Sequence, residues 1–175
     1  MEGERVAVVT GGGRGIGLAT ARRLAADGLR VLVLEVSERA AAGARSWAAE
    51  APARRALALA SVTDREAVRR TLAELIAAWG RLDVVVNNAG INRPGGIADQ
   101  GDGDWAAVLA VNLSGPFVVS GEAQRHLRPG GAVVHVGSIG AAGFGASPAY
   151  AASKAGLIGL ARQMAHELGP RDITV

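Results

Sequence analysis

Residues 6–17 read VAVVTGGGRGIG, a short apolar run that passes directly into a glycine-rich turn. The run Val6–Thr10 does not alternate with polar residues, which is typical of a strand buried on both faces, as in a parallel sheet. A helical pattern follows at 16–27, so this stretch predicts a strand, a tight turn and a helix. Glycines in such a turn let the backbone approach a phosphate closely, and the helix N-terminus offers free N–H groups.

The same alternation continues along the chain. Further apolar runs lie at 31–35, 56–60, 82–87 and 132–137, and further helical patterns lie at 38–50, 64–79, 103–127 and 148–168. A capping box formed by Thr63 and Glu66 is expected to open the third helix. This order predicts an α/β fold, a doubly wound parallel sheet in a single domain that spans residues 1–175.

Composition narrows the function classes. The 175 residues include no cysteine, which excludes disulfides and thiolate metal sites and fits a cytoplasmic protein. The net charge is +3 and the arginines are scattered among acidic residues, so we expect no nucleic-acid partner. The first strand starts almost at once and no apolar run has the length of a membrane span, so we expect neither a signal peptide nor a membrane partner. His126 and His135 lack partners at metal-ligand spacing, and no metal site is expected.

One acidic residue bears on the cofactor. Glu35 ends the second predicted strand, about 20 residues after the glycine turn, where a carboxylate accepts hydrogen bonds from an adenosine ribose diol. A carboxylate there would repel a 2′-phosphate, so Glu35 favours NAD. Arg14 points the other way because its guanidinium suits a phosphate, so NADP stays possible.

More polar residues follow later strands, at the edge where open α/β sheets bind ligands. The sequence has Asn87-Asn88-Ala89-Gly90 after one strand and Ser138 after the next. Tyr150 is the only tyrosine, and Lys154, four residues later, is the only lysine. Residues at this spacing share a helix face, and a neighbouring ammonium favours a phenolate. The pair is therefore a candidate acid/base.

Together these motifs resemble the short-chain dehydrogenase/reductase family. The matching motifs are TGGGRGIG at 10–17, NNAG at 87–90, Asn112 in VNLSG, Ser138, and YAASK at 150–154. The resemblance implies a Rossmann fold and an NAD(P)-dependent oxidoreductase that transfers hydride between a nicotinamide cofactor and an alcohol or carbonyl substrate, for example a 3-oxoacyl compound or another ketone. The alternative is a truncated, catalytically silent dinucleotide-binding or interaction module.

The resemblance also assigns roles. Tyr150 resembles the general acid/base, Lys154 would favour its ionised form and bind the nicotinamide ribose, and Ser138 would hold the substrate carbonyl or hydroxyl. Asn112 would hold a water that extends a proton relay from Lys154. The implied cofactor-binding residues are Thr10, Gly11, Arg14, Gly15, Ile16, Gly17, Glu35, Asn88, Ala89, Gly90, Tyr150 and Lys154. The helices at 103–127 and 148–168 resemble those through which the family forms homo-oligomers.

Three departures from the family pattern have consequences. The spacing from Ser138 to Tyr150 is one residue shorter than is usual, so the loop between them must tighten. Ser61 stands where the family commonly has an acid against the adenine ring. Ile173–Val175 match the start of a sixth strand, so the last strands and the substrate lid of the family are expected to be lacking. We therefore expect exposed apolar surface and self-association.

Overall fold

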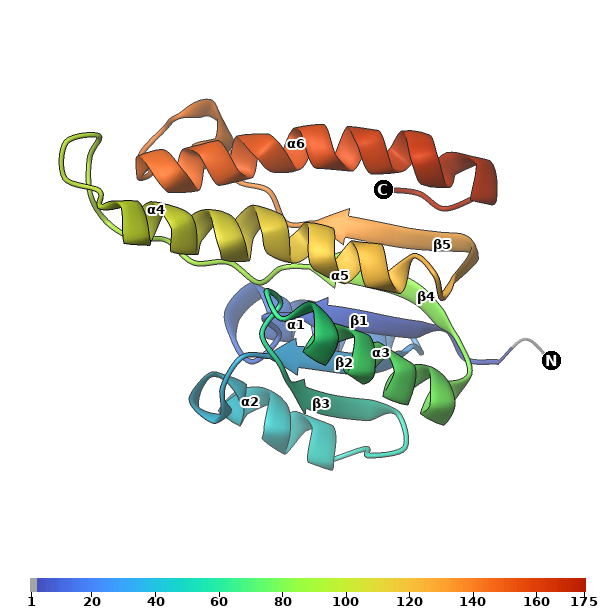
Figure 1. Ribbon diagram of the computed structural model, residues 1–175. Helices are drawn as coiled ribbons and strands as arrows, with labels where there is room; N and C mark the ends of the chain where they lie inside the picture. The colour runs from blue at the N-terminus through green and yellow to red at the C-terminus, as the bar shows by residue number, and fades with distance from the viewer. Residues whose placement is uncertain (1–2) are drawn as a thin grey trace.

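The computed structural model describes residues 3–175 as a parallel sheet between helices (Figure 1). Its strands are β1 (Val6–Thr10), β2 (Arg30–Glu35), β3 (Arg55–Leu59), β4 (Leu82–Asn87) and β5 (Leu127–His135). Its helices are α1 (Gly15–Ala26), α2 (Glu38–Ala49), α3 (Arg65–Trp79), α4 (Asp102–Leu109), α5 (Gly115–Ala123) and α6 (Pro148–Leu168). A π-helical turn, η1 (Ala110–Ser114), joins α4 to α5, and short 3₁₀ turns, η2 (Ile139–Ala142) and η3 (Gly169–Arg171), flank α6.

The strands are ordered β3-β2-β1-β4-β5 and all pair in parallel. The chain leaves β1 toward β2 and β3 on one side and returns to β4 and β5 on the other. This confirms the predicted doubly wound sheet. The reversal of direction places the carboxyl ends of β1 and β4 side by side, which is where such sheets bind ligands.

Alternate residues of the strands form two hydrophobic cores. On one face Val6, Val8 and Val85 pack with residues of α3 and α5. On the other face Ala7 and Val9 pack with residues of α1 and α2. Because every residue of β1 is buried, the central strand reads as an unbroken apolar run rather than an alternating one.

Two predicted boundaries were wrong at β5 and at the helix before it. The strand begins at Leu127 rather than 132, because Leu127 pairs with Leu82 across a register shift. Pro129 and Gly130 within that segment are ordinary turn signals and conceal the strand. The preceding helix therefore ends at Ala123, and Leu127 is a buried strand residue.

The predicted cap of α3 also needs correction. Asp64, not Thr63, is the N-cap residue, and its carboxylate accepts a hydrogen bond from Ala67 N. The Thr63 hydroxyl instead pairs with the Ser61 hydroxyl at 2.8 Å. An aspartate next to a threonine competes for the same cap, and here the aspartate occupies it.

The continuous helix Asp102–Ala123, formed by α4, η1 and α5, is long and apolar enough to cross a membrane by length and composition alone. Half of its most apolar stretch is buried inside the protein, as in the core helix of a globular fold. The helix α6 runs alongside it (Figure 1). Beyond α6, Thr174 pairs in parallel with Ala132 of β5, as expected for the start of a further strand.

Candidate active site

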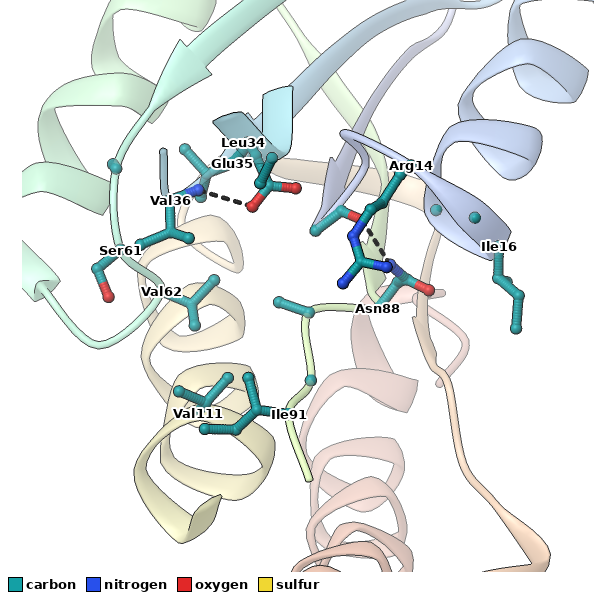
Figure 2. A pocket seen from close by; sticks show the side chains of 17 residues that line it. Arg14, Ile16, Leu34, Glu35, Val36, Ser61, Val62, Asn88, Ile91 and Val111 are labelled. Carbon is teal, nitrogen blue, oxygen red and sulfur yellow. Dashed lines mark hydrogen bonds between the residues drawn. The ribbon is translucent and has the colours of Figure 1, made fainter. Parts of the chain in front are cut away.

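A cleft of about 390 Å³ opens at the carboxyl ends of the strands. It is lined by Gly11, Arg14, Gly15, Ile16, Gly17, Leu34, Glu35, Val36, Ala40, Ala60, Ser61, Val62, Asn88, Ala89, Gly90, Ile91 and Val111. Figure 2 shows Glu35, Val36 and Ser61 on one side and Arg14 and Ile16 on the other. Nine of the predicted cofactor-binding residues are among these seventeen lining residues. Most of the lining residues that were not predicted are apolar, such as Leu34, Val62 and Val111, and an apolar side chain at a strand end carries no chemical signal.

The glycine turn is shaped as a cradle. Gly11 has φ 61°, and a Cβ there would lie 2.7 Å from Ala89 Cα, so only glycine lets β1 and β4 approach this closely. A Cβ on Gly17 would overlap Gly11 O and Asn88 Nδ2. The first turn of α1 faces the cleft through Gly15, Ile16 and Gly17, and its free N–H groups suit a phosphate. These residues fit the pyrophosphate of a dinucleotide.

Thr10 and Asn88 hold the cradle together from behind. The Thr10 hydroxyl accepts hydrogen bonds from Asn88 N and Ala89 N, both at 3.1 Å. The Asn88 amide donates to Thr10 O at 3.0 Å and to Gly11 O at 2.9 Å. Thr10 is buried and does not line the cleft. Its side chain therefore positions the cradle rather than facing a ligand.

Glu35 lies at the carboxyl end of β2 and is only 8% exposed. Its Oε2 accepts a hydrogen bond from Gly13 N at 3.0 Å, and its Oε1 accepts one from Val36 N at 2.8 Å. These bonds fix a carboxylate in the cleft wall, where it can accept from hydroxyl groups and cannot donate. Gly13 was not predicted as a site residue. A Cβ at this position would overlap the Ala40 carbonyl and would also meet Glu35 Oε2 at 2.8 Å, so glycine is required here.

Arg14 is the cation of the cleft. It is exposed at the N-terminus of α1, and its side chain makes no capping bond. Within residues 3–175 no ion pair or hydrogen bond holds its guanidinium. The group is therefore available to an anionic ligand.

Tyr150 and Lys154 lie on one face in the first turns of α6, as the spacing predicted. Ser147 caps the helix by accepting from Tyr150 N at 3.4 Å. Lys154 Nζ lies 5.8 Å from the centre of the Tyr150 ring and donates to Val136 O at 2.7 Å. Lys154 is buried, and burial lowers the pKa of its ammonium.

Asn112 lies in the π-helical turn and is fully buried. Its Oδ1 accepts from Ile91 N at 2.8 Å, while its Nδ2 donates to Ile91 O at 2.9 Å and to Ser153 Oγ at 3.1 Å. Ser153 Oγ in turn donates to Tyr150 O at 2.8 Å. Asn112 thus ties the segment after β4 to the turn that carries Tyr150. Ser153 and Ile91 were missed, although Ser153 stands within the YAASK motif.

Ser138 begins η2, and its Oγ accepts a hydrogen bond from Gly140 N at 3.0 Å. A Cβ on Gly140 would lie 3.1 Å from Tyr150 Cε1, so this turn packs directly on the tyrosine ring. Gly143 and Gly145, with φ 85° and 63°, return the chain to α6. The tight turn brings Ser138 to the Tyr150 side of the sheet.

Behind the site, the buried amide of Asn87 contacts two further polar side chains. Asn87 Nδ2 donates to Ser120 Oγ at 2.9 Å and approaches His135 Nδ1 at 3.3 Å. Burial, with a smaller contribution from the charge of Lys154, lowers the pKa of His135. Within residues 3–175 no cluster of metal-ligating side chains includes it or any other histidine.

Comparisons with known proteins agree with this geometry. A family model described as short chain dehydrogenase matches residues 5–175. The short-chain reductase protein NovJ of Streptomyces niveus is 39% identical over 98% of the chain. The 3-oxoacyl-[acyl-carrier-protein] reductase FabG of Escherichia coli is 36% identical over the same share.

Solved structures give the same result. A short chain dehydrogenase from Burkholderia cenocepacia, in complex with NADP, superposes with a TM-score of 0.87 at 45% identity and covers 98% of this chain. A dehydrogenase/reductase from Sinorhizobium meliloti gives 0.91 at 39% identity and covers 99%.

The chain spans 66% of the length of the Streptomyces relative and 70% of the Escherichia relative. It spans 71% of the Burkholderia chain and 70% of the Sinorhizobium chain. Nearly all of this chain is matched in each case, and the family model spans both the glycine cradle and the Tyr150–Lys154 turn. The chain belongs to the short-chain dehydrogenase family of NAD(P)-dependent oxidoreductases.

Proposed function

We propose that Tyr150, Lys154, Ser138 and Asn112 carry out hydride-transfer chemistry on a small alcohol or ketone substrate beside the cofactor cleft. One observation carries the proposal. A Cβ on Gly90, at the end of the cleft, would lie 3.4 Å from Asn112 Oδ1 and 3.8 Å from Lys154 Nζ. The cleft that fits a dinucleotide therefore ends beside the acid/base residues.

Each side chain has a role that its surroundings support. Tyr150 gives its phenol proton to the substrate oxygen in reduction and takes it back in oxidation. Within residues 3–175 no hydrogen bond engages its hydroxyl, so that group is free for a substrate. Ser138 holds the same substrate oxygen through its hydroxyl.

The ammonium of Lys154 lies 5.8 Å from the centre of the Tyr150 ring and suits the hydroxyls of a nicotinamide ribose. Asn112 positions the turn that carries Tyr150. Both N–H groups of its amide already donate to Ile91 and Ser153. A proton relay from Lys154 would therefore run through water or along the backbone of the π-helical turn, and not through the Asn112 amide. Such turns recur at functional sites because they interrupt regular helix hydrogen bonding.

Bound nicotinamide dinucleotide supplies or accepts the hydride. We propose NAD as the preferred form, because the fixed carboxylate of Glu35 accepts from a ribose diol and repels a 2′-phosphate. Arg14 supports a second possibility, since its free guanidinium suits that phosphate. The Burkholderia relative was solved with NADP. The preference of this protein between NAD and NADP, on which Glu35 and Arg14 act in opposite directions, is therefore to be measured.

The names of the relatives support a ketone as the substrate class. The Escherichia relative is a 3-oxoacyl reductase and the Streptomyces relative is a reductase. A catalytically silent dinucleotide-binding module is not favoured, because Tyr150, Lys154, Ser138 and Asn112 are all present and Tyr150 and Lys154 share one helix face.

The test has two steps on the same protein. Calorimetric titration with NAD and NADP measures cofactor binding, and turnover with a panel of small alcohols and ketones follows. Binding with turnover of at least one ketone supports the proposal. Binding without turnover of any panel member would favour the silent module.

We also propose a homo-oligomer that uses the helices α5 and α6. A groove of about 400 Å³ runs between them, lined partly by Phe117, Leu160 and Met164. Phe117 is 56% exposed and Ile158, on α6, is 48% exposed.

We propose a cytoplasmic location, which the lack of cysteine supports.

A further inference from the structure

The end of the cleft beyond Glu35 differs in chemistry from the rest of it. This end, called the base end here, is lined by Leu34, Val36, Ala60, Ser61, Val62 and Val111. Among these described residues none carries a charge, and Ser61 has the only polar side chain. The end is thus an apolar slot suited to the flat face of a purine, with one hydroxyl at its edge (Figure 2).

The hydroxyl at this edge is not committed to one polarity. Ser61 Oγ lies 2.8 Å from Thr63 Oγ1, and either oxygen can be the donor. Ser61 Oγ also accepts from Thr63 N at 3.2 Å. A hydroxyl both donates and accepts by rotating its proton, and its partner Thr63 can exchange roles with it.

Glu35 provides the contrast within the same cleft. Its two oxygens are held in place by backbone N–H groups and can only accept. A carboxylate at position 61 would likewise attract the 6-amino group of adenine and repel a 6-oxo group. Serine imposes no such choice on the base.

We propose that the base end accepts 6-amino and 6-oxo purines alike, so that nicotinamide hypoxanthine dinucleotide binds nearly as well as NAD. This inference rests on the proposed dinucleotide function and adds the class of base that the cleft takes. The ribose and phosphate contacts are identical in the two ligands, so any difference between them reports on the base end alone.

The test is a calorimetric titration of the 175-residue protein with each dinucleotide, which requires no turnover. We expect the two dissociation constants to agree within about threefold, because no side chain of fixed polarity lines the base end. In Ser61→Asp the preference for adenine should rise by about tenfold or more, since a charged acceptor then faces that position.

Ser37→Asp is the matched control. It makes the same substitution at the exposed N-cap of α2, which does not line the cleft and where aspartate also caps a helix, and it should leave the ratio of dissociation constants unchanged. A preference of the unmodified protein for NAD by more than about tenfold would overturn the inference. An unchanged ratio in Ser61→Asp would overturn it too, because position 61 would then not face the base. If neither dinucleotide binds, the proposed cofactor function fails first and the inference fails with it.

Discussion

At the scale of single residues, the cleft contains a hydrogen-bond acceptor in a fixed position, Glu35, and a cation without a bound partner, Arg14. Glu35 is buried and held by two backbone bonds, whereas Arg14 is exposed and unheld. A fixed group discriminates more sharply than a mobile one, because its geometry does not adapt to the wrong ligand. We therefore expect the choice between NAD and NADP to depend on Glu35 first.

Glu35→Ala should weaken NAD binding about tenfold, because a charged acceptor for the ribose diol is lost. NADP binding should weaken less or improve, since the repulsion of its 2′-phosphate is lost as well. Titration with both cofactors measures the ratio. Glu38→Ala is the control, because Glu38 is an exposed carboxylate paired with Arg45 outside the cleft. If the unmodified protein binds NADP at least about tenfold more tightly than NAD, the assignment to Glu35 is wrong and Arg14 dominates.

Tyr150→Phe should lower turnover by about 10²–10⁴-fold while NAD binding stays within about twofold. Phenylalanine keeps the ring that packs on Gly140 and removes only the proton that the reaction transfers. Parallel measurements of turnover and of NAD titration separate chemistry from binding. Substantial turnover in this variant would refute the acid/base role.

The sequence alone predicted most of these site residues but not the residues that position them. The glycine turn, Glu35, Tyr150 and Lys154 carry chemistry that spacing makes visible. Gly13 could not be identified, because its role is to leave room for the Ala40 backbone and the Glu35 carboxylate. Ser153 could not be identified either, because its hydrogen bond with Asn112 joins residues 41 positions apart in the sequence.

At the scale of elements, a buried carboxylate joins α3 to α5. Glu122 on α5 is only 2% exposed. Its Oε1 accepts from Arg65 at 2.7 Å and its Oε2 from Arg69 at 3.2 Å. Hydrogen bonds from Arg69 and then Arg65 lower the pKa of Glu122 to about 2. The two helices that cover one face of the sheet are thus held by charge as well as by apolar packing.

Glu122→Gln should lower the free energy of unfolding by about 1–3 kcal/mol near neutral pH, because two guanidinium groups lose a charged acceptor. The pKa of this carboxyl is lower in the folded than in the unfolded protein, so its stabilisation is present above about pH 4.5 and is lost as the pH falls toward 2. Urea unfolding of both proteins at about pH 7 and about pH 3 should therefore show a gap that narrows in acid.

Glu66→Gln is the control for that experiment. Glu66 is exposed and pairs with Arg69 and Arg70 on the surface of α3, where a salt bridge contributes about 0–1 kcal/mol. An equal loss of stability in both variants, or a gap that persists unchanged in acid, would contradict a special role for Glu122.

The elements themselves were predicted where local signals agree with tertiary contacts. The helix α6 and the strands β1 and β4 have the bounds that the sequence pattern gave. The start of β5 did not, because Pro129 and Gly130 signal a turn and only the pairing of Leu127 with Leu82 makes the segment a strand. The π-helical turn that holds Asn112 was not predicted either, and the bonds of this side chain to Ile91 join residues 21 positions apart in the sequence.

At the scale of the whole molecule, exposed apolar side chains include residues of β5, α5 and α6. Val134 on β5 is 47% exposed, on the side opposite Val133, which packs in the core of the α3 and α5 face. Phe117 and Ile158 are exposed on the adjacent helices α5 and α6. Exposed apolar residues gathered on neighbouring elements mark interaction surfaces more often than scattered ones do. The fold was predicted from the order of strands and helices, whereas these surfaces depend on which face each residue takes.

We expect the isolated chain to self-associate through α5 and α6. Phe117→Ser and Ile158→Ser, singly and combined, should shift it toward the monomer, because each removes apolar surface that association buries. Analytical ultracentrifugation over a range of protein concentrations measures the shift. Ile97→Ser is the control, because Ile97 is 90% exposed but lies in the loop before α4 rather than on these helices. A monomeric parent chain would refute the assembly outright. If only Ile97→Ser weakens the oligomer, the interface lies at the loop before α4, and α5 and α6 do not form it.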